Sequence, residues 1–167
     1  MNTFFDRIES PFGVIYLLLK DGKKLAGVSF GQRPQGVKRG AAPALLISEF
    51  NAYFAGGLRE FKSPVVLLSG TQFEQDVWLC LREIPYGGTR TYKWVSERVG
   101  RPGASRAVGQ ALSRNPIPLV LPCHRVIESN GGLGGYSPSV EIKRRILDME
   151  YYHSLLDRPA DAFLPRS

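Results

Sequence analysis

Cys123 is the first candidate for a reactive side chain in this sequence, because a histidine and an arginine follow it directly. It comes after an apolar run, residues 117–121, that is predicted to be a buried strand. The thiolate is the reactive form of cysteine, and a neighbouring histidine or arginine lowers the pKa of a thiol. Consecutive side chains on a strand point to opposite faces, however, so adjacency is weak evidence. The residue types favour a buried, inert Cys123 and leave an activated nucleophile as the alternative.

The remaining sulfur and imidazole groups point to no second reactive centre. Cys80 lies on the predicted helix 71–84 between apolar residues, which is typical of a core cysteine. Two cysteines form at most one disulfide, which is too sparse for a disulfide-stapled secreted scaffold. His124 and His153 complete the set of soft ligands, and no pair has the spacing of a zinc site. We therefore expect no metal.

The region after residue 70 is predicted to consist mainly of helices. Thr71 and Glu74 form the pattern of a capping box at the start of helix 71–84. Two short helices, 92–99 and 104–113, are joined by a turn that contains glycine, which is the pattern of a helix-turn-helix. A glycine-rich loop at 130–136 precedes a last helix at 139–156, for which Ser139 is the expected cap.

The first 70 residues have a different pattern. Strands are predicted within residues 4–30, with a hairpin at Asp21-Gly22, followed by a polar loop at 31–40. A helix is predicted at 45–54 and a strand at 65–68. The expected fold is an α+β N-terminal domain, residues 1–70, with a small β-sheet and a helix. A mainly α-helical C-terminal domain, residues 71–167, would contain the helix-turn-helix.

The chain is basic, with 22 lysines and arginines against 15 aspartates and glutamates, a net charge of +7. Such a charge suits nucleic acid, an acidic membrane surface or plain solubility. Residues 86–125 hold one acidic residue against seven basic ones, which favours a nucleic-acid surface: Arg90, Lys93, Arg98, Arg101, Arg106, Arg114 and Arg125. The sequence has neither an apolar stretch of about 18 residues nor a signal peptide pattern, so we expect no membrane contact and a cytoplasmic location.

Arg106 lies near the start of the second short helix, among small residues that include Ser105, Ala107 and Gly109. Small side chains allow a helix to approach another backbone closely, and helix N-termini suit phosphate groups. The alternative is that these small residues serve tight packing inside the protein. The residue types leave both interpretations open.

Five short motifs together carry a resemblance to a known family. They are Ile84-Pro85-Tyr86-Gly87, Thr89-Arg90-Thr91-Tyr92, Arg106-Ala107-Val108-Gly109, Asn115-Pro116 and Pro122-Cys123-His124-Arg125-Val126. In this order and spacing, the chain resembles the O6-alkylguanine-DNA alkyltransferases from about residue 71 to residue 150. The first 70 residues resemble that family only in size and in their order of strands and helix.

The resemblance implies a methylated-DNA-[protein]-cysteine S-methyltransferase that repairs DNA in a single turnover and needs no cofactor. Its partner would be double-stranded DNA containing O6-alkylguanine, with O4-alkylthymine as a further substrate. The damaged base would be flipped out, because its target atom is inaccessible within the duplex. The alkyl group would then pass irreversibly to Cys123. The resemblance also implies a monomer, and cooperative binding to DNA stays open.

The family's reactive groups match four residues of this chain. Cys123 matches the nucleophile and His124 the general base, which acts on the thiol through a water. Glu150 matches the carboxylate that orients this base, a form of the nucleophile, base and orienter arrangement. Tyr92 matches the tyrosine that helps to rotate the nucleotide and donates a proton towards the departing guanine. A helix-capping aromatic is the alternative for Tyr92.

The family's binding residues match a second set of positions. Asn115 matches the residue that braces the cysteine turn, and the guanine pocket would be formed by the carbonyl of Val126 with Tyr136 and Ser137. Arg106 matches the arginine that fills the gap left by the flipped base. The recognition helix would enter the minor groove, which is only about 6 Å wide and suits small side chains. The small residues of the recognition helix are Ser105, Ala107 and Gly109.

Three other functions compete with this one. A non-catalytic lesion-binding protein of the alkyltransferase-like group would lack the cysteine. A helix-turn-helix transcription regulator would select a DNA sequence, and a cysteine hydrolase would turn over many times. The chain also departs from the family pattern at Gly88, at Lys93-Trp94 and at Pro138, and the last of these bears on the range of alkyl groups admitted.

Overall fold

The structure, a computed structural model, describes residues 2–136 and 138–157. Its N-terminal part is a four-stranded sheet with the order β3-β2-β1-β4. The first three strands form an antiparallel meander, and the short β4 pairs in parallel with β1. The strands are β1 (Thr3–Ser10), β2 (Gly13–Lys20), β3 (Lys24–Phe30) and β4 (Lys38–Arg39).

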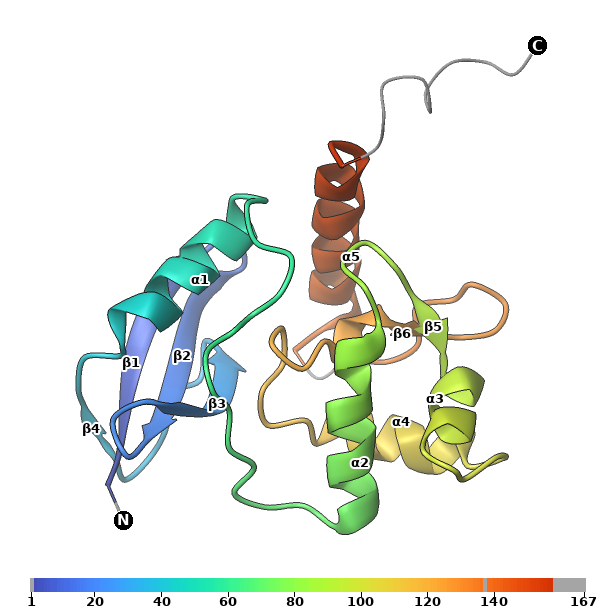
Figure 1. Ribbon diagram of the computed structural model, residues 1–167, viewed down its shortest axis with the longest axis horizontal. Helices are drawn as coiled ribbons and strands as arrows, with labels where there is room; N and C mark the ends of the chain where they lie inside the picture. Colours follow the sequence, from blue (N-terminus) through green and yellow to red (C-terminus); the bar gives the residue numbers. More distant parts are fainter. Residues whose placement is uncertain (1, 137, 158–167) are drawn as a thin grey trace.

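Helix α1 (Ala44–Phe54) lies across one face of this sheet (Figure 1). Alternate residues of β2 are fully buried, as the two-residue period of a half-buried strand requires: Ile15, Leu17 and Leu19. The helix buries Phe50 and Tyr53. The predicted sheet and helix are confirmed, and they place Tyr53 near the end of α1 that approaches the helical part of the molecule.

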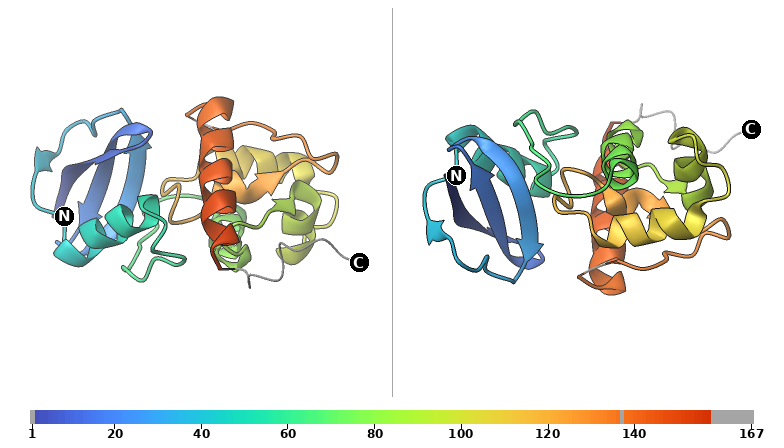
Figure 2. Two further views of the ribbon diagram at one scale, coloured as in Figure 1. Left: turned by 90° about the horizontal axis from the view of Figure 1, so that it is seen from above. Right: turned by 90° about the horizontal axis from the view of Figure 1, so that it is seen from below.

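The rest of the described chain is mainly helical and lies at the other end of the molecule (Figure 2). Two short strands, β5 and β6, pair in parallel between the helices. The elements are α2 (Gln72–Cys80), the 3-10 helix η1 (Leu81–Glu83), β5 (Arg90–Thr91), α3 (Tyr92–Arg98), α4 (Ser105–Ser113), the 3-10 helix η2 (Cys123–Arg125), β6 (Val126–Ile127) and α5 (Val140–Leu155).

The helix boundaries follow local signals, so the sequence predicted them closely. The capping box is present, with Thr71 Oγ1 accepting from the Glu74 amide at 3.1 Å and Glu74 accepting from the Thr71 amide at 3.0 Å. Ser139 caps α5 by accepting from the Ile142 amide at 3.0 Å. Each cap satisfies an amide that the first helical turn leaves unpaired.

Two predicted strands are wrong. Residues 65–68 form only a single bridge with the described residues, between Val65 and Leu25, because farther along this edge of β3 the Val28 amide donates to the Pro116 carbonyl at 2.9 Å instead. Residues 117–121 form a tight turn closed by a hydrogen bond from the Leu121 amide to the Ile117 carbonyl at 2.9 Å. Leu119 adopts a φ of 74°, which a bulky side chain rarely does and which no strand contains. Cys123 therefore follows a turn and begins η2.

One continuous apolar core joins the sheet to the helices, from Leu17 in β2 to Ile146 in α5. The two parts are also joined through the backbone, since the Val28 amide of β3 donates to the Pro116 carbonyl at 2.9 Å. Among the described residues, no helix has the length and apolar character of a membrane span. The same residues contain no cluster of three side chains suited to hold a metal ion.

Candidate active site

The turn that presents Cys123 is held by Asn115. The Asn115 side chain donates to the Leu121 carbonyl at 2.8 Å and accepts from the Ile117 amide at 3.0 Å. These two bonds close the loop in which Leu119 has its positive φ. Sparsely populated backbone conformations cost about 1–3 kcal/mol and persist only where the surroundings impose them. Asn115 thus lies where a residue bracing the cysteine turn must lie.

The Cys123 thiol is buried, with 6% of the residue exposed. Burial raises the pKa of this thiol to about 11, against the opposing effects of a hydrogen bond from Asn115 and the positive charge of Lys143. The neighbouring histidine and arginine do not produce a resting thiolate, contrary to what their adjacency suggests. Cys123 is therefore a thiol at neutral pH, and a base must remove its proton during any reaction.

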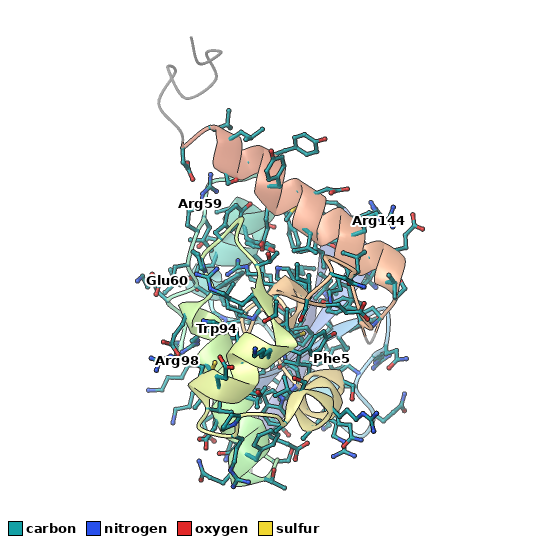
Figure 3. All side chains as sticks on the ribbon, turned by 90° about the vertical axis from the view of Figure 1, so that its right-hand side faces the viewer. Phe5, Arg59, Glu60, Trp94, Arg98 and Arg144 are labelled. Atoms are coloured by element: carbon teal, nitrogen blue, oxygen red, sulfur yellow. The ribbon has the colours of Figure 1, made fainter. Side chains whose placement is uncertain are left out.

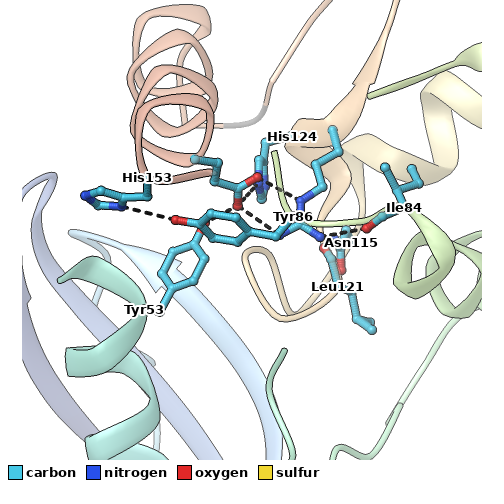
Figure 4. Close-up of polar contacts among 9 residues, drawn as sticks. Tyr53, Ile84, Tyr86, Asn115, Leu121, His124 and His153 are labelled. Atoms are coloured by element: carbon cyan, nitrogen blue, oxygen red, sulfur yellow. Dashed lines mark hydrogen bonds and ion pairs between the residues drawn. The ribbon is translucent and has the colours of Figure 1, made fainter. Parts of the chain in front are cut away.

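His124 and Glu150 form a buried pair beside this thiol, and both residues are inaccessible to solvent. The Nε2 atom of His124 lies 2.8 Å from Oε2 of Glu150 (Figure 4). Since a carboxylate accepts hydrogen bonds, Nε2 carries the proton and Nδ1 has a free lone pair. That Nδ1 is buried and bonds to none of the residues described. The pair has the arrangement of a general base held by a carboxylate.

Arg125 also binds this carboxylate, through Nε at 2.8 Å and Nη2 at 2.9 Å. Burial opposes the ionisation of Glu150, but the hydrogen bond from His124 and the Arg125 guanidinium outweigh burial and hold the pKa of the carboxyl well below its usual range. Burial also lowers the pKa of His124, and Glu150 only partly opposes this effect. The histidine is therefore neutral at pH 7 and able to accept a proton.

Cys123 lines a cavity of about 390 Å³ between α3, α4 and the loop before α5. This volume lies in the range of small-molecule sites. The lining residues include Tyr92, Gly109, Cys123, Gly134, Gly135 and Tyr136. Four of the predicted site residues therefore face one space, although Tyr92 and Tyr136 are far apart in the sequence.

Tyr92 begins α3, directly after its cap Thr91, and its phenol oxygen packs against Gly134. A side chain at Gly134 would collide with this phenol, which explains a glycine with a φ of 69° at that position. Burial raises the pKa of Tyr92, while a hydrogen bond with the Gly135 backbone lowers it. The phenol is protonated at neutral pH and can donate into the cavity.

Tyr136 contributes the opposite wall. Its hydroxyl is buried and has no hydrogen-bond partner among the described residues. Its ring packs edge-on against Phe30 of β3, with 6.4 Å between the centroids, so the N-terminal part supports this wall. A buried polar group without a partner is costly unless a ligand satisfies it. Ser137, the other predicted pocket residue, lies outside the described residues.

Lys143 is a site residue that the sequence reasoning missed. Its ammonium group is buried and donates to the carbonyls of Val126, at 2.7 Å, and of Leu133 and Gly135. It thereby holds the loop before α5, called the pocket loop below, against this helix. It also binds the Val126 carbonyl, which was predicted to contact the guanine base. One signal was available, because Lys143 shares a helix face with the buried Ile146 and Glu150. A lysine on a buried face needs such partners.

The residues assigned to DNA lie on α4. Arg106 and Ala107 are exposed near its start, and Ser105 is half-buried. Gly109 faces the cavity, and a methyl group there would meet nothing closer than the Tyr92 ring at 3.8 Å. The alternative explanation for Gly109 was close packing inside the protein. The described residues around Gly109 show no such close packing. Because Gly109 has no side chain, it leaves room there for a partner outside the chain.

The seven basic residues between 86 and 125 are not all free of partners within the chain. Three are paired with carboxylates: Arg98 with Glu83, Arg114 with Glu74 and Arg125 with Glu150. Arg98 lies with Trp94 on α3 (Figure 3). The other four form no ion pair with a described residue: Arg90, Lys93, Arg101 and Arg106. The charge available to an external anion is thus smaller than the sequence count suggests.

Comparisons with known proteins agree on one family. The sequence model for the "6-O-methylguanine DNA methyltransferase, DNA binding domain" matches residues 72–152. A methylated-DNA–protein-cysteine methyltransferase from Methanosarcina barkeri is 43% identical over 88% of this chain and 96% of its own length. One from Mycobacterium leprae is 50% identical over 65% of this chain and 66% of its own length.

Solved structures extend the similarity to the whole fold. The O6-methylguanine methyltransferase of Mycobacterium tuberculosis superimposes with a TM-score of 0.84 at 37% identity, over 96% of this chain and 98% of that one. Mycobacterium tuberculosis OGT in complex with DNA gives a TM-score of 0.83 at 38% identity, over 95% of this chain and 97% of that one. The similarity thus includes the N-terminal sheet, which the sequence motifs did not cover.

Proposed function

The chain belongs to the methylated-DNA–protein-cysteine methyltransferase family, and we propose that the cysteine it methylates is Cys123. It is a DNA-binding repair enzyme that transfers a methyl group from DNA to a protein cysteine. One observation carries the assignment to Cys123. Its thiol lines the cavity, and the next residue is His124, whose Nδ1 has no hydrogen-bond partner among the described residues and whose Nε2 is held by a buried carboxylate.

In the proposed reaction, Nδ1 of His124 accepts the thiol proton through a bridging water. The sulfur of Cys123 then attacks the alkyl carbon on O6 of guanine. An S–C bond forms, the C–O bond breaks, and its electron pair stays with guanine. Tyr92 donates a proton to the guanine ring, and the proton held by His124 returns to the phenolate through solvent. The products are a thioether and unmodified guanine, so no cofactor is consumed and each protein acts once.

The cavity accounts for recognition of the flipped base. Its walls are two aromatic rings, Tyr92 and Tyr136, and the backbone of the loop held by Lys143. The buried hydroxyl of Tyr136, which bonds to none of the residues that the structure describes, would bond to a polar edge of the base. O6-alkylguanine is the proposed substrate and O4-alkylthymine a second one, because both carry an alkyl group on an exocyclic oxygen.

Helices α3 and α4 with the turn between them are the proposed helix-turn-helix, with α4 in the minor groove. The small residues near the start of α4 suit a narrow groove, and readout would be through the backbone with little sequence preference. Arg106 would enter the stack in place of the extruded base. Its exposure, and the absence of an ion pair with any described residue, support this role.

Transfer is tested with duplex DNA that carries a labelled O6-methylguanine. We expect one methyl group per protein molecule, found by peptide mass analysis as an adduct on Cys123. A duplex with O6-benzylguanine tests the width of the cavity in parallel. A protein that bears no adduct after complete mixing would contradict the proposal. Continued turnover with a free thiol would support the cysteine hydrolase instead.

Replacing Arg106 should separate base extrusion from chemistry. In Arg106→Ala, we expect the rate of transfer from duplex DNA to fall about tenfold or more, because nothing fills the gap left by the extruded base. Free O6-benzylguanine needs no extrusion, so its reaction with Cys123 should keep its wild-type rate. Both rates are measured under single-turnover conditions.

The matched control is Arg114→Ala, which removes an arginine at the other end of α4 that is already paired with Glu74. We expect this variant to react with both substrates at close to the wild-type rates. An Arg106→Ala variant that slowed both substrates equally would assign Arg106 to the fold or to the chemical step.

A further inference from the structure

The Glu150 carboxylate has a hydrogen-bond partner from the opposite end of the chain. Tyr53, on α1 of the N-terminal part, places its hydroxyl 2.5 Å from Oε2 of Glu150 across 97 residues of sequence (Figure 4). Both side chains are buried, with Tyr53 only 1% exposed. Oε2 thus accepts from three donors, two from the helical part and one from α1. The carboxylate that holds His124 is shared between both parts of the molecule.

The C-terminal end of α1 is fixed against α5, so the position of Tyr53 is well defined. Gly56 follows the helix with a φ of 86°, and a side chain there would lie 2.8 Å from the ring of His153. Arg59 donates to Asp157 at 2.8 Å and to the His153 carbonyl at 3.2 Å. These contacts, at the end of α5 and just after it, lie three and seven residues beyond Glu150 in the sequence. They hold α1 at the distance that the hydroxyl of Tyr53 requires.

We propose that Tyr53 is a positioning residue for alkyl transfer: its hydroxyl fixes the Glu150 carboxylate, which in turn orients the His124 imidazole. The N-terminal part of the chain would therefore complete the catalytic machinery. This inference rests on the proposed function, because it gives Tyr53 a task only if His124 acts as the base for Cys123.

The chemistry of the hydroxyl agrees with this task. Burial raises the pKa of Tyr53 well above its ordinary value, and the negative charge of Glu150 raises it further. The phenol therefore stays protonated and acts only as a donor. A carboxylate with several donors is held in one rotamer, and hydrogen bonds to charged groups are stronger than those between neutral groups. With the carboxylate fixed, the Nδ1 atom of His124 keeps the orientation in which it accepts the Cys123 proton in the proposed reaction.

A purely structural role for Tyr53 would depend on its ring. That ring packs against Phe54, Phe61 and Tyr86, with centroids 5.4 to 5.9 Å away. Phenylalanine would keep all of these contacts and lose only the hydroxyl. The substitution Tyr53→Phe therefore separates positioning from packing. Tyr86→Phe is the matched control, because the Tyr86 hydroxyl faces His153 at 3.2 Å.

The pH dependence provides a signature that packing cannot mimic. Several charged and titratable groups surround His124: Glu150 and Lys143 from α5, Arg125 from η2, and Cys123 beside it. Tyr53 from α1 acts on it through Glu150. Without the Tyr53 hydroxyl, fewer donors share the negative charge of Glu150, which then favours the imidazolium more strongly. The pKa of His124 rises as a result. Because the base must be neutral, the acid limb of the rate profile moves to higher pH.

The experiment measures single-turnover methyl transfer from O6-methylguanine duplex to the full-length chain from pH 5 to 9. For Tyr53→Phe, we expect a rate constant about tenfold lower at neutral pH, an acid limb shifted upward, and the same final adduct on Cys123. For Tyr86→Phe, we expect the wild-type rate constant and an acid limb of the pH profile at the wild-type position. The end point counts the competent molecules, so a partly unfolded sample does not distort the rate constant.

Tyr53→Phe with the wild-type rate and limb would overturn the inference, and so would an equal loss in both variants without a shifted limb. A second assay follows the reaction of Cys123 with iodoacetamide against pH, without DNA. If wild-type protein accepts no methyl group, the proposed function fails, and this assay still decides the inference. A reactivity profile that differs between wild type and Tyr53→Phe supports it, and identical profiles overturn it.

Discussion

Cys123→Ala should bind O6-methylguanine duplex with an affinity close to that of the wild type and accept no methyl group. Among the described residues that line the cavity, Cys123 alone supplies a sulfur that can form a thioether, so the loss is complete rather than partial. The residue is small and its turn is held by Asn115, so alanine should keep the fold. Binding is measured by titration of labelled duplex, and transfer by mass analysis of the whole protein.

The second cysteine provides the control. Cys80 is buried at the end of α2, outside the cavity, and burial raises the pKa of its thiol to about 11 as well. The two thiols are alike in burial and pKa, and they differ in what surrounds them. Cys80→Ala should therefore transfer at the wild-type rate. An adduct on Cys80, or an unreactive Cys80→Ala, would show that the position of the thiol had been misassigned.

Glu150→Gln should lower both the transfer rate and the stability. Glutamine cannot carry the charge that holds His124 as a base, and general base catalysis contributes about 100-fold or more to a rate. It also leaves the Arg125 guanidinium buried without a counter-ion, which costs about 3–5 kcal/mol in the free energy of unfolding. Single-turnover kinetics and urea unfolding measure the two effects.

The same variant should change how stability depends on pH. The pKa of Glu150 in the folded protein lies below its ordinary value of 4.5, so the folded state binds this proton less readily than the unfolded state. Glu150 therefore contributes stability that is fully present above pH 4.5 and lost as the pH falls below it. This part of the acid destabilisation should be missing from Glu150→Gln.

A double-mutant cycle separates the charge pair from other effects. Arg125→Met alone should also be strongly destabilising, because it leaves the carboxylate buried without its permanent positive partner. The double variant, Arg125→Met with Glu150→Gln, should lose less than the sum of the two single losses. Additive losses would mean that the two side chains act independently, against the geometry of their two hydrogen bonds.

Local signals in the sequence predicted the elements that depend on neighbours along the chain. Helix caps, glycines after helix ends and alternating apolar residues each act within a few positions, so α1 to α5 and β1 to β3 could be located. Predictions were wrong where the residue pattern of a segment favoured a strand but its surroundings in the fold did not pair with it. The apolar runs at 65–68 and 117–121 suit strands. Pro116 occupies the edge of β3 beyond Leu25, which leaves the first run a single bridge, and the positive φ of Leu119 makes the second run a turn.

The candidate site was likewise predicted only in part from the sequence. The consecutive Cys123 and His124, with the resemblance that their motif carries, predicted the reactive centre and its base from the sequence alone. Only the tertiary structure showed that the thiol is protonated at rest, that Arg125 is an internal counter-ion, and that Lys143 and Tyr53 hold the pocket loop and the carboxylate. These features depend on burial and on contacts between distant segments. Neither is encoded in residue spacing, because both arise only when the core that joins the sheet to the helices has formed.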